Sequence, residues 1–174
     1  MKLLVIDTDY RPNKLGEPVI RIYGKKVNCS DEGVNVVLHI KGFDPYFYVN
    51  EDWKALDEVK NTLGDSVKKI ELVKKYKPIG YQMEKTEMLK VVLYNPKDTP
   101  KCRELLERID IEVFEADVQF KNRFLIDTGI SGMSVIEFNH IGTELPNYGL
   151  NCNETYITNY KDIRITNDKI NIEY

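Results

Sequence analysis

The stretch that decides the fold runs from Tyr46 to Val118 and reads YFYVNEDWKALDEVKNTLGDSVKKIELVKKYKPIGYQMEKTEMLKVVLYNPKDTPKCRELLERIDIEVFEADV. It opens with a short aromatic segment, Tyr46 to Val49, that predicts a β-strand. The next segment, Glu51 to Leu63, carries apolar residues at helical spacing until Gly64 interrupts the pattern. Those apolar residues are Trp53, Leu56, Val59 and Leu63.

Two further strands are predicted after this helix. Val67 to Val73 is rich in β-branched residues and ends in lysines, and Met88 to Tyr94 is a strong apolar strand. A second helix is expected to begin at Asp98-Thr99-Pro100, because Thr99 suits the N-cap and Pro100 suits the first helical position.

The second helix is expected to turn Leu105, Leu106 and Ile109 inward, and Ile111 to Val118 is the last predicted strand. The complete order is β-α-β-β-α-β, which predicts a ferredoxin-like unit over residues 46–118.

The flanking segments, residues 1–45 and 119–174, predict a mostly antiparallel β subdomain. Apolar runs at Lys2 to Ile6, Val19 to Tyr23 and Val34 to Ile40 predict strands of one sheet. A helix is expected over Gln119 to Ile126, with Gly129 at its end. Loops are expected at Asn147, Gly149, Asn151 and Asn153, and Tyr156 to Ile172 predicts a hairpin that turns near Asn167-Asp168. The expected fold class is α+β, with the ferredoxin-like unit inserted into this subdomain.

The composition is that of a soluble globular chain. Of its 174 residues, 42% are hydrophobic and 30% charged, with a net charge of −3, which excludes wholesale disorder. A nucleic-acid site would therefore have to be a local patch. Cys29, Cys102 and Cys152 are odd in number and lack metal-ligand spacing, so idle thiols in a reducing cytosol are expected. No signal peptide or membrane span is predicted, which gives a cytoplasmic location.

Two acidic motifs resemble metal-binding sites without their usual context. Asp7-Thr8-Asp9 is similar to a polymerase palm motif but has no recognisable third carboxylate. Asp110-Ile111-Glu112 is similar to an exonuclease motif, but no apolar strand leads into it and no later aspartates have the spacing of such a site. We interpret the first as the end of an edge strand and the second as a helix-to-strand junction. His39 and His140 belong to no triad or zinc pattern. No catalytic residue and no metal site are predicted.

The remaining chemical signal is aromatic and cationic. Phe43-Asp44-Pro45-Tyr46-Phe47-Tyr48 is dense in rings that could stack on an unpaired base, although Phe47 and every second neighbour are expected to pack in the core. Lys121 and Arg123 lie near a helix start, where phosphate could bind; the alternative is an exposed helix charge.

Together these segments resemble the amino-terminal domain of archaeal family B DNA polymerases. The resemblance extends from about Leu3 to Gly129. The motifs that carry it, in order, are IDTDY (Ile6–Tyr10), PVIRIY (Pro18–Tyr23), FDPYFYV (Phe43–Val49), YNPKDTP (Tyr94–Pro100) and FEADVQFKNRFLID (Phe114–Asp127).

The resemblance implies a pocket that captures uracil in template DNA ahead of the polymerase active site. Carried over residue by residue, the pocket would consist of Tyr10, Pro45, Tyr46, Pro96, Thr99, Val118 and Phe120, with Lys121 and Arg123 supporting the strand or the pocket. Thr99 departs from the family, which has an apolar β-branched residue there. Its hydroxyl either weakens uracil capture or caps the helix, so DNA contact is the firmer expectation.

The chain ends at Tyr174 without exonuclease or palm motifs, so a fragment of a larger polymerase is expected, or else a free-standing accessory protein derived from one. The resemblance implies no cofactor in this fragment and Mg²⁺ in the complete polymerase. The implied partners are single-stranded template DNA and the exonuclease and palm domains of the same enzyme, and a monomer is expected.

Two alternatives stay open. The central topology is shared with RNA-binding modules of the RRM type, which would place base-stacking aromatic residues on the two central strands. The other alternative is a structural domain that only supports an exonuclease and never touches nucleic acid, which the net charge of −3 favours.

Overall fold

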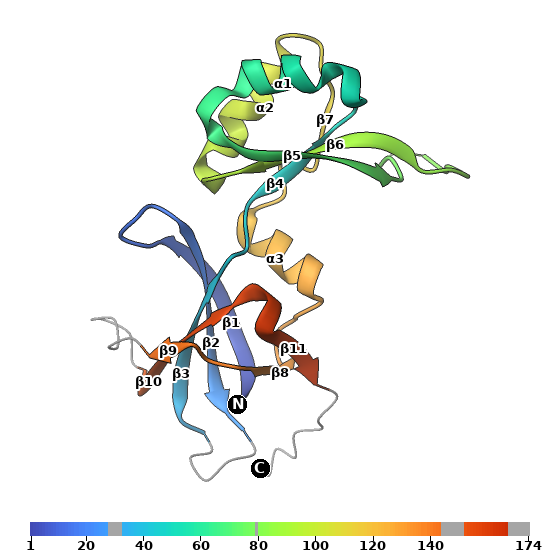
Figure 1. The fold of residues 1–174 in the computed structure, drawn as a ribbon. Coiled ribbons are helices and arrows are strands. Elements are labelled where there is room, and N and C mark those ends of the chain that lie inside the picture. Colours follow the sequence, from blue (N-terminus) through green and yellow to red (C-terminus); the bar gives the residue numbers. More distant parts are fainter. Residues whose placement is uncertain (28–32, 79, 144–151, 167–174) are drawn as a thin grey trace. The chain divides into compact units, whose positions relative to one another are not determined.

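Figure 1 shows the computed structural model of the chain, which describes residues 1–27, 33–78, 80–143 and 152–166. Cys29, the expected loop residues Asn147, Gly149 and Asn151, and the predicted turn at Asn167-Asp168 lie outside the described residues. The chain divides into two compact units. Unit 1 consists of Met1–Phe43 and Lys121–Tyr174, and unit 2 consists of Asp44–Phe120.

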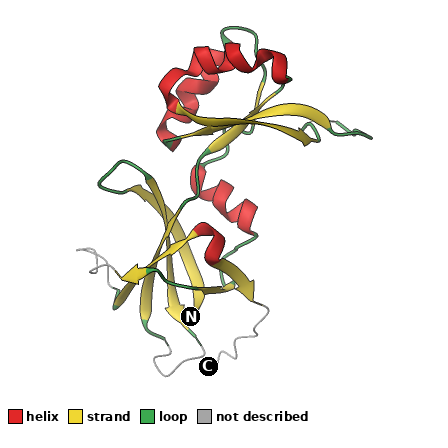
Figure 2. Ribbon diagram, in the orientation of Figure 1, coloured by secondary structure: helices red, strands yellow, loops and turns green. Residues whose placement is uncertain are grey.

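Unit 2 is a four-stranded antiparallel sheet with two helices on one face (Figure 2). In order across the sheet the strands are β5 (Val67–Lys75), β6 (Thr86–Leu93), β4 (Tyr46–Val49) and β7 (Val113–Phe114), and the helices are α1 (Leu56–Leu63) and α2 (Thr99–Glu107). The first strand of the unit lies between the third and the fourth, which is the ferredoxin-like order. The predicted α+β fold class is confirmed.

Short 3-10 turns lead into both helices of unit 2. The carboxylate of Asp52 accepts a hydrogen bond from the Lys54 amide (2.8 Å) at the turn before α1. The turn before α2, η3 (Pro96–Asp98), is capped in the same way by Asn95, whose side chain accepts from the Lys97 amide (3.0 Å). The prediction that Thr99 caps the helix is wrong: Asn95 supplies the capping oxygen, and Thr99 is the first residue of α2.

The core of unit 2 lies between the sheet and its helices. Phe47, Val49, Leu89, Val91 and Leu106 are fully buried in one cluster, as alternation along β4 and β6 requires. This confirms Phe47 as a core residue.

Three details of the prediction for unit 2 are wrong. Trp53 is 64% exposed because it belongs to the 3-10 turn η1 (Trp53–Ala55) and not to the face of α1. Ile109 is 39% exposed because α2 has already ended at Glu107. The last strand is only Val113–Phe114, since Glu115 adopts a left-handed backbone (φ +62°) that turns the chain.

Unit 1 is built on a sheet whose described strands follow the order β11-β8-β1-β2-β3-β10-β9. Neighbouring strands are antiparallel except for β10 and β3, which are parallel. The strands are β1 (Lys2–Pro12), β2 (Pro18–Lys26), β3 (Asn35–Lys41), β8 (Val135–Phe138), β9 (Gly142–Thr143), β10 (Glu154–Asn159) and β11 (Ile163–Thr166).

The two faces of the central strands of unit 1 differ in character. Ile20, Ile22, Leu38 and Ile40 are fully buried on one face. Alternation turns the residues between them to the other face, which is polar. Helix α3 (Phe120–Thr128) adds the fully buried Phe124, whose ring lies 5.3 Å from that of Phe43. None of the helices in the described part of the chain is long and apolar enough to cross a membrane.

The described residues contain only the first arm of the hairpin predicted for Tyr156 to Ile172, and this arm consists of two separate strands. β10 pairs with β3 and β9, whereas β11 pairs with β8, on the far side of the sheet. The 3-10 turn η4 (Tyr160–Asp162) separates the two strands and redirects the chain. Local alternation alone therefore indicated strands but not their partners.

Candidate nucleic-acid interface

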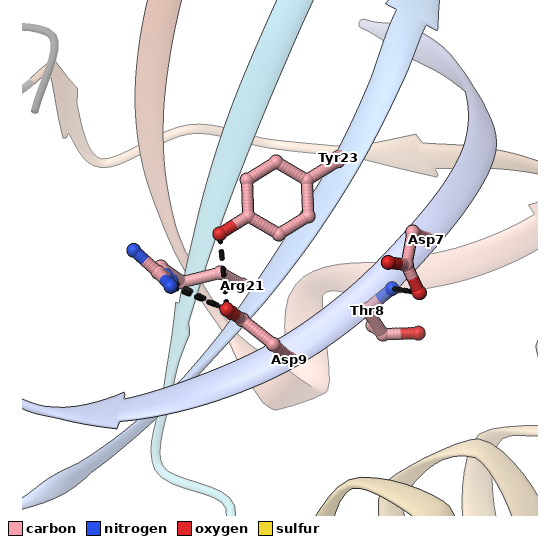
Figure 3. Close-up of polar contacts among 5 residues, drawn as sticks. All are labelled: Asp7, Thr8, Asp9, Arg21 and Tyr23. Atoms are coloured by element: carbon pink, nitrogen blue, oxygen red, sulfur yellow. Dashed lines mark hydrogen bonds and ion pairs between the residues drawn. The ribbon is translucent and has the colours of Figure 1, made fainter. Parts of the chain in front are cut away.

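The Asp7-Thr8-Asp9 motif lies within β1, opposite β2 (Figure 3). Asp9 is opposite Arg21, and its carboxylate accepts two hydrogen bonds from that guanidinium, one of them from Nε at 2.7 Å. The Tyr23 hydroxyl donates to the same carboxylate at 3.1 Å. Asp7 accepts a hydrogen bond from the Thr8 amide at 2.7 Å. Asp9 is thus a structural counter-ion, and in this strand the motif lacks the hairpin-tip position of a palm motif. The interpretation as the end of an edge strand is wrong, because β1 continues to Pro12 and lies between β8 and β2 in the sheet.

Burial and the charge of Asp9 both shift the pKa values of Arg21 and Tyr23. Burial by itself would lower the pKa of Arg21, but the hydrogen bonds and negative charge of Asp9 outweigh it and raise that pKa above its ordinary value. Removal from water, followed by the charge of Asp9, also raises the pKa of Tyr23. Tyr23 therefore stays protonated and donates its hydroxyl proton to Asp9.

Asp9→Asn is expected to lower the free energy of unfolding of unit 1 by about 2 kcal/mol. The change leaves the buried guanidinium of Arg21, whose side chain is 4% exposed, without its counter-charge, while the 40% exposure of Asp9 lets water offset part of the loss. Hydrogen exchange of the β1 and β2 amides measures the difference. Asp7→Asn is the matched control, because an amide oxygen can still accept from Thr8. An equal loss in the two variants would contradict the assignment.

The Asp110-Ile111-Glu112 motif is a junction, as interpreted from the sequence. Asp110 has a left-handed backbone (φ +59°) just beyond α2, and Ile111 is buried in the core of unit 2. The Glu112 carboxylate accepts a hydrogen bond from the Asn50 side chain at 2.7 Å. The three residues therefore connect a helix to a strand.

The residues assigned to a base pocket by resemblance lie in unit 2, with the exception of Tyr10. Strand β4 runs antiparallel to both neighbours, with Tyr46 opposite Val92 and Tyr48 opposite Phe114. The start of β4 consequently lies at the same end of the sheet as the ends of β6 and β7. The segments next to these strand ends carry Pro45 and Tyr46 before and at the start of β4, Pro96 and Thr99 after β6, and Val118 and Phe120 after β7.

A backbone hydrogen bond fixes two of these segments to each other. The Leu93 amide, at the end of β6, donates to the carbonyl of Pro45 at 2.9 Å. Pro45 and Phe120 are buried, while the other four residues at this end of the sheet are half-buried and reach the surface. Those four are Tyr46, Pro96, Thr99 and Val118.

The other predicted contact residues belong to unit 1. Tyr10 lies in β1 opposite Ile20 and is half-buried. Lys121 and Arg123 lie in the first turn of α3, where Lys121 is half-buried and Arg123 is 6% exposed. Arg123 is therefore not the exposed helix charge that the alternative interpretation required.

The open face of the unit 2 sheet offers few free ring surfaces to bases. Tyr46 and Tyr48 contact each other edge to face, with ring centroids 5.6 Å apart. The Lys90 ammonium lies 3.9 Å from the centroid of the Tyr46 ring, and Tyr48 is only 8% exposed. The neighbouring strand β6 contributes Met88 and Lys90 to this cluster and no aromatic residue. Base stacking of the RRM type needs exposed flat rings, so this face does not favour that alternative.

The histidines and described cysteines carry no catalytic arrangement. His39 lies within β3 and is 7% exposed, and the His140 ring packs 5.1 Å from the ring of Tyr156. Burial, followed by the charge of Asp98, raises the pKa of the Cys102 thiol, which keeps it protonated in the core of unit 2.

A set of basic residues in unit 1, not singled out from the sequence, lines one groove. Arg11, Lys14, Arg21, His39 and Lys41 contribute to its walls. They are scattered between positions 11 and 41, so no basic run marks them. The sequence feature that could have revealed them is strand alternation, which turns Arg21 and His39 to the same face of the sheet. The pairing of β2 with β3 then places these two residues opposite each other.

Known proteins similar to this chain are DNA polymerases. The DNA polymerase of Thermococcus kodakarensis is 32% identical over 139 residues, 75% of this chain and 8% of that protein. The DNA polymerase of Methanocaldococcus jannaschii is 35% identical over 127 residues, 65% of this chain and 8% of that protein. The chain therefore spans less than a tenth of either relative. No protein-family model matches it.

The fold of the chain is also similar to that of a solved DNA polymerase. The family B DNA polymerase of the hyperthermophilic archaeon Pyrobaculum calidifontis superimposes on 91% of this chain with a TM-score of 0.71 and 26% identity, over 20% of the polymerase chain. By sequence and by fold, the chain is a homologue of the amino-terminal domain of the archaeal family B DNA polymerases.

Proposed function

We propose that this chain is a non-catalytic domain that binds single-stranded template DNA for a family B DNA polymerase. The observation that carries the proposal is the convergence of three segments at one end of the unit 2 sheet. Because β4 is antiparallel to both β6 and β7, the start of β4 and the ends of β6 and β7 lie at one end of the sheet. The segments next to these strand ends carry a proline and an aromatic ring, a second proline with a helix start, and a further apolar pair.

Such a set suits an unpaired base. Proline rings are rigid, so they form apolar walls that lose little conformational entropy when a base is bound. Polar groups beside such walls can recognise the polar edge of the base. A base in template DNA ahead of a polymerase is unpaired and needs no extra energy for extrusion from a duplex.

The finer proposal is that this pocket distinguishes uracil from thymine. The two bases differ by one methyl group, and a tight pocket rejects one extra carbon by roughly tenfold. The structure removes one role from Thr99, since Asn95 caps the turn before α2. We propose that the hydroxyl of the half-buried Thr99 instead adds a polar group to the wall of the candidate pocket.

The chemistry of the proposed parent enzyme belongs to other domains. We propose that exonuclease and palm domains of the same polymerase are the partners of this chain, and that the palm uses Mg²⁺ for nucleotidyl transfer. The contribution of this chain is to hold and inspect the template strand.

Affinities for two labelled single strands test the proposal. We expect the chain to bind a thymidine 12-mer carrying one central deoxyuridine about tenfold more tightly than the all-thymidine 12-mer, because the methyl group of thymine is excluded. Thr99→Trp is expected to fill the pocket and bring the ratio to about one. Thr99→Val is expected to raise the ratio above that of the original chain, by removing the hydroxyl from the wall. Fluorescence anisotropy at low salt measures each value.

Lys101→Trp is the matched control, because Lys101 is exposed on the same helix two residues further on. It should keep the preference for uracil, and the ratio is insensitive to the lost charge because the two strands carry equal charge. Equal affinity of the original chain for both strands would contradict uracil recognition. Absence of binding to either strand at low salt would favour a purely structural domain.

A further inference from the structure

A second candidate site lies in unit 1, in a groove of about 690 Å³ formed by the hairpin between β1 and β2 and by the end of β3. Its walls carry Arg11, Lys14, Arg21, His39 and Lys41. Strand register explains the grouping, because Arg21 is opposite His39, and Arg11 and Lys41 lie two positions further along on the same face.

The groove is positive in a chain whose net charge is −3. No aspartate or glutamate contributes to its lining. Arg11, Lys14 and Lys41 form no ion pair with any residue that the structure describes. Like charges that lie close together repel one another, so an anion bound among these three cations is stabilised.

Arg21 gives the groove a fixed donor. Its side chain is 4% exposed, and two of its nitrogens are held by Asp9. Figure 3 shows the remaining terminal nitrogen turned away from Asp9. A guanidinium carries five N–H donors, so the pair with Asp9 orients Arg21 without exhausting its hydrogen-bonding capacity.

The chemistry of the walls selects among anions. Beside the cations, the groove is lined by Pro12, Leu15 and Val19, and the Leu15 side chain is 84% exposed. Cationic groups next to exposed apolar surface match a strand that alternates phosphates with sugars and bases. A volume of about 690 Å³ is within the range of pockets that bind small organic ligands, so the groove has room for part of a nucleotide strand.

We propose that this groove binds the phosphate backbone of single-stranded DNA, as a contact separate from the base pocket of unit 2. The inference rests on the proposed function in one respect, that single-stranded DNA is the ligand. It does not depend on uracil recognition, because the groove contacts backbone phosphates that every sequence has.

The test compares two triple variants in their binding to the all-thymidine 12-mer between 50 and 200 mM KCl. We expect Arg11→Gln/Lys14→Gln/Lys41→Gln to weaken binding at low salt about tenfold. We expect the slope of log affinity against log salt to become shallower by about 2, since each lost phosphate contact on a single strand removes about 0.7. Lys54→Gln/Lys60→Gln/Arg108→Gln, three exposed cations of unit 2, is the control with the same loss of charge. Circular dichroism checks that both variants are folded.

An equal change in the salt slope of the two variants would overturn the proposal that the groove binds DNA, because the loss of net charge alone would then explain the effect. A second experiment measures the binding of inorganic phosphate to the original chain and to the groove variant. If phosphate binds the original chain as tightly as the 12-mer and the groove variant loses both, the site takes a free anion and the strand proposal fails. The preference for uracil should survive in the groove variant, so loss of groove binding and loss of base recognition are separate outcomes.

Discussion

Gly24→Ala is expected to lower the free energy of unfolding of unit 1 by about 3 kcal/mol. Gly24 lies in β2 opposite Val5, beside the irregularity in register between Val5 and Asp7. A Cβ atom at this position would lie 2.2 Å from the carbonyl oxygen of Leu4 and 2.8 Å from the Cγ atom of Leu3. The nearest atom is backbone in the paired strand, so relief requires β1 and β2 to separate locally. Hydrogen exchange of the β1 and β2 amides measures the effect.

Gly132→Ala is the matched control, because a Cβ atom there meets nothing within 4 Å and the backbone is not left-handed. It should change the stability of unit 1 by less than about 0.5 kcal/mol. A Gly24 variant as stable as the Gly132 variant would mean that β1 and β2 do not approach as closely as described.

Phe47→Ala is expected to lower the free energy of unfolding of unit 2 by about 4 kcal/mol. The Phe47 side chain is fully buried between β4 and the two helices, among residues that include Val59 and Leu106. Removing the ring loses its transfer free energy and leaves a cavity that rigid strands and helices cannot close. Hydrogen exchange of the β4 and β6 amides reports the loss.

Trp53→Ala removes an even larger ring from the same unit but from a side chain that is 64% exposed. It should cost less than about 1 kcal/mol. If the Trp53 variant were the less stable of the two, the assignment of Phe47 to the core and of Trp53 to the surface would be wrong.

Sequence patterns were sufficient for the order of elements in unit 2. Alternation in Tyr46 to Val49 and helical spacing up to Gly64 are local signals, and the two helices and four strands follow from them. Helix and strand limits were less accurate because they depend on single residues. Asn95 supplies the cap assigned to Thr99, and the left-handed Glu115 ends the last strand early.

Unit 1 was harder to predict because its pairings are non-local. β10 joins β3 in parallel across more than a hundred residues, and β11 joins β8 instead of its neighbour in sequence. Alternation shows which residues form a strand and which face each side chain occupies, but it carries no information about the partner strand.

The two candidate sites could be predicted from the sequence to different degrees. The base pocket came from resemblance, since Pro45, Pro96 and Val118 have no chemistry that marks them as a set in the sequence. The structure adds that the start of β4 lies at the same end of the sheet as the ends of β6 and β7, because β4 is antiparallel to both. The groove of unit 1 escaped notice because its cations come from three separate strands and loops, and Asp9 balances one of them.

The most direct test of template-base recognition is a comparison of backbone amide chemical shifts during titration with the thymidine 12-mer and with its single-uracil counterpart. The account predicts uracil-dependent changes at Tyr46, Thr99 and Val118, which lie at one end of the unit 2 sheet. Tyr76, beyond β5 at the opposite end, should respond equally to both strands. Identical shifts for the two strands throughout the chain, or uracil-dependent changes confined to the far end, would contradict it.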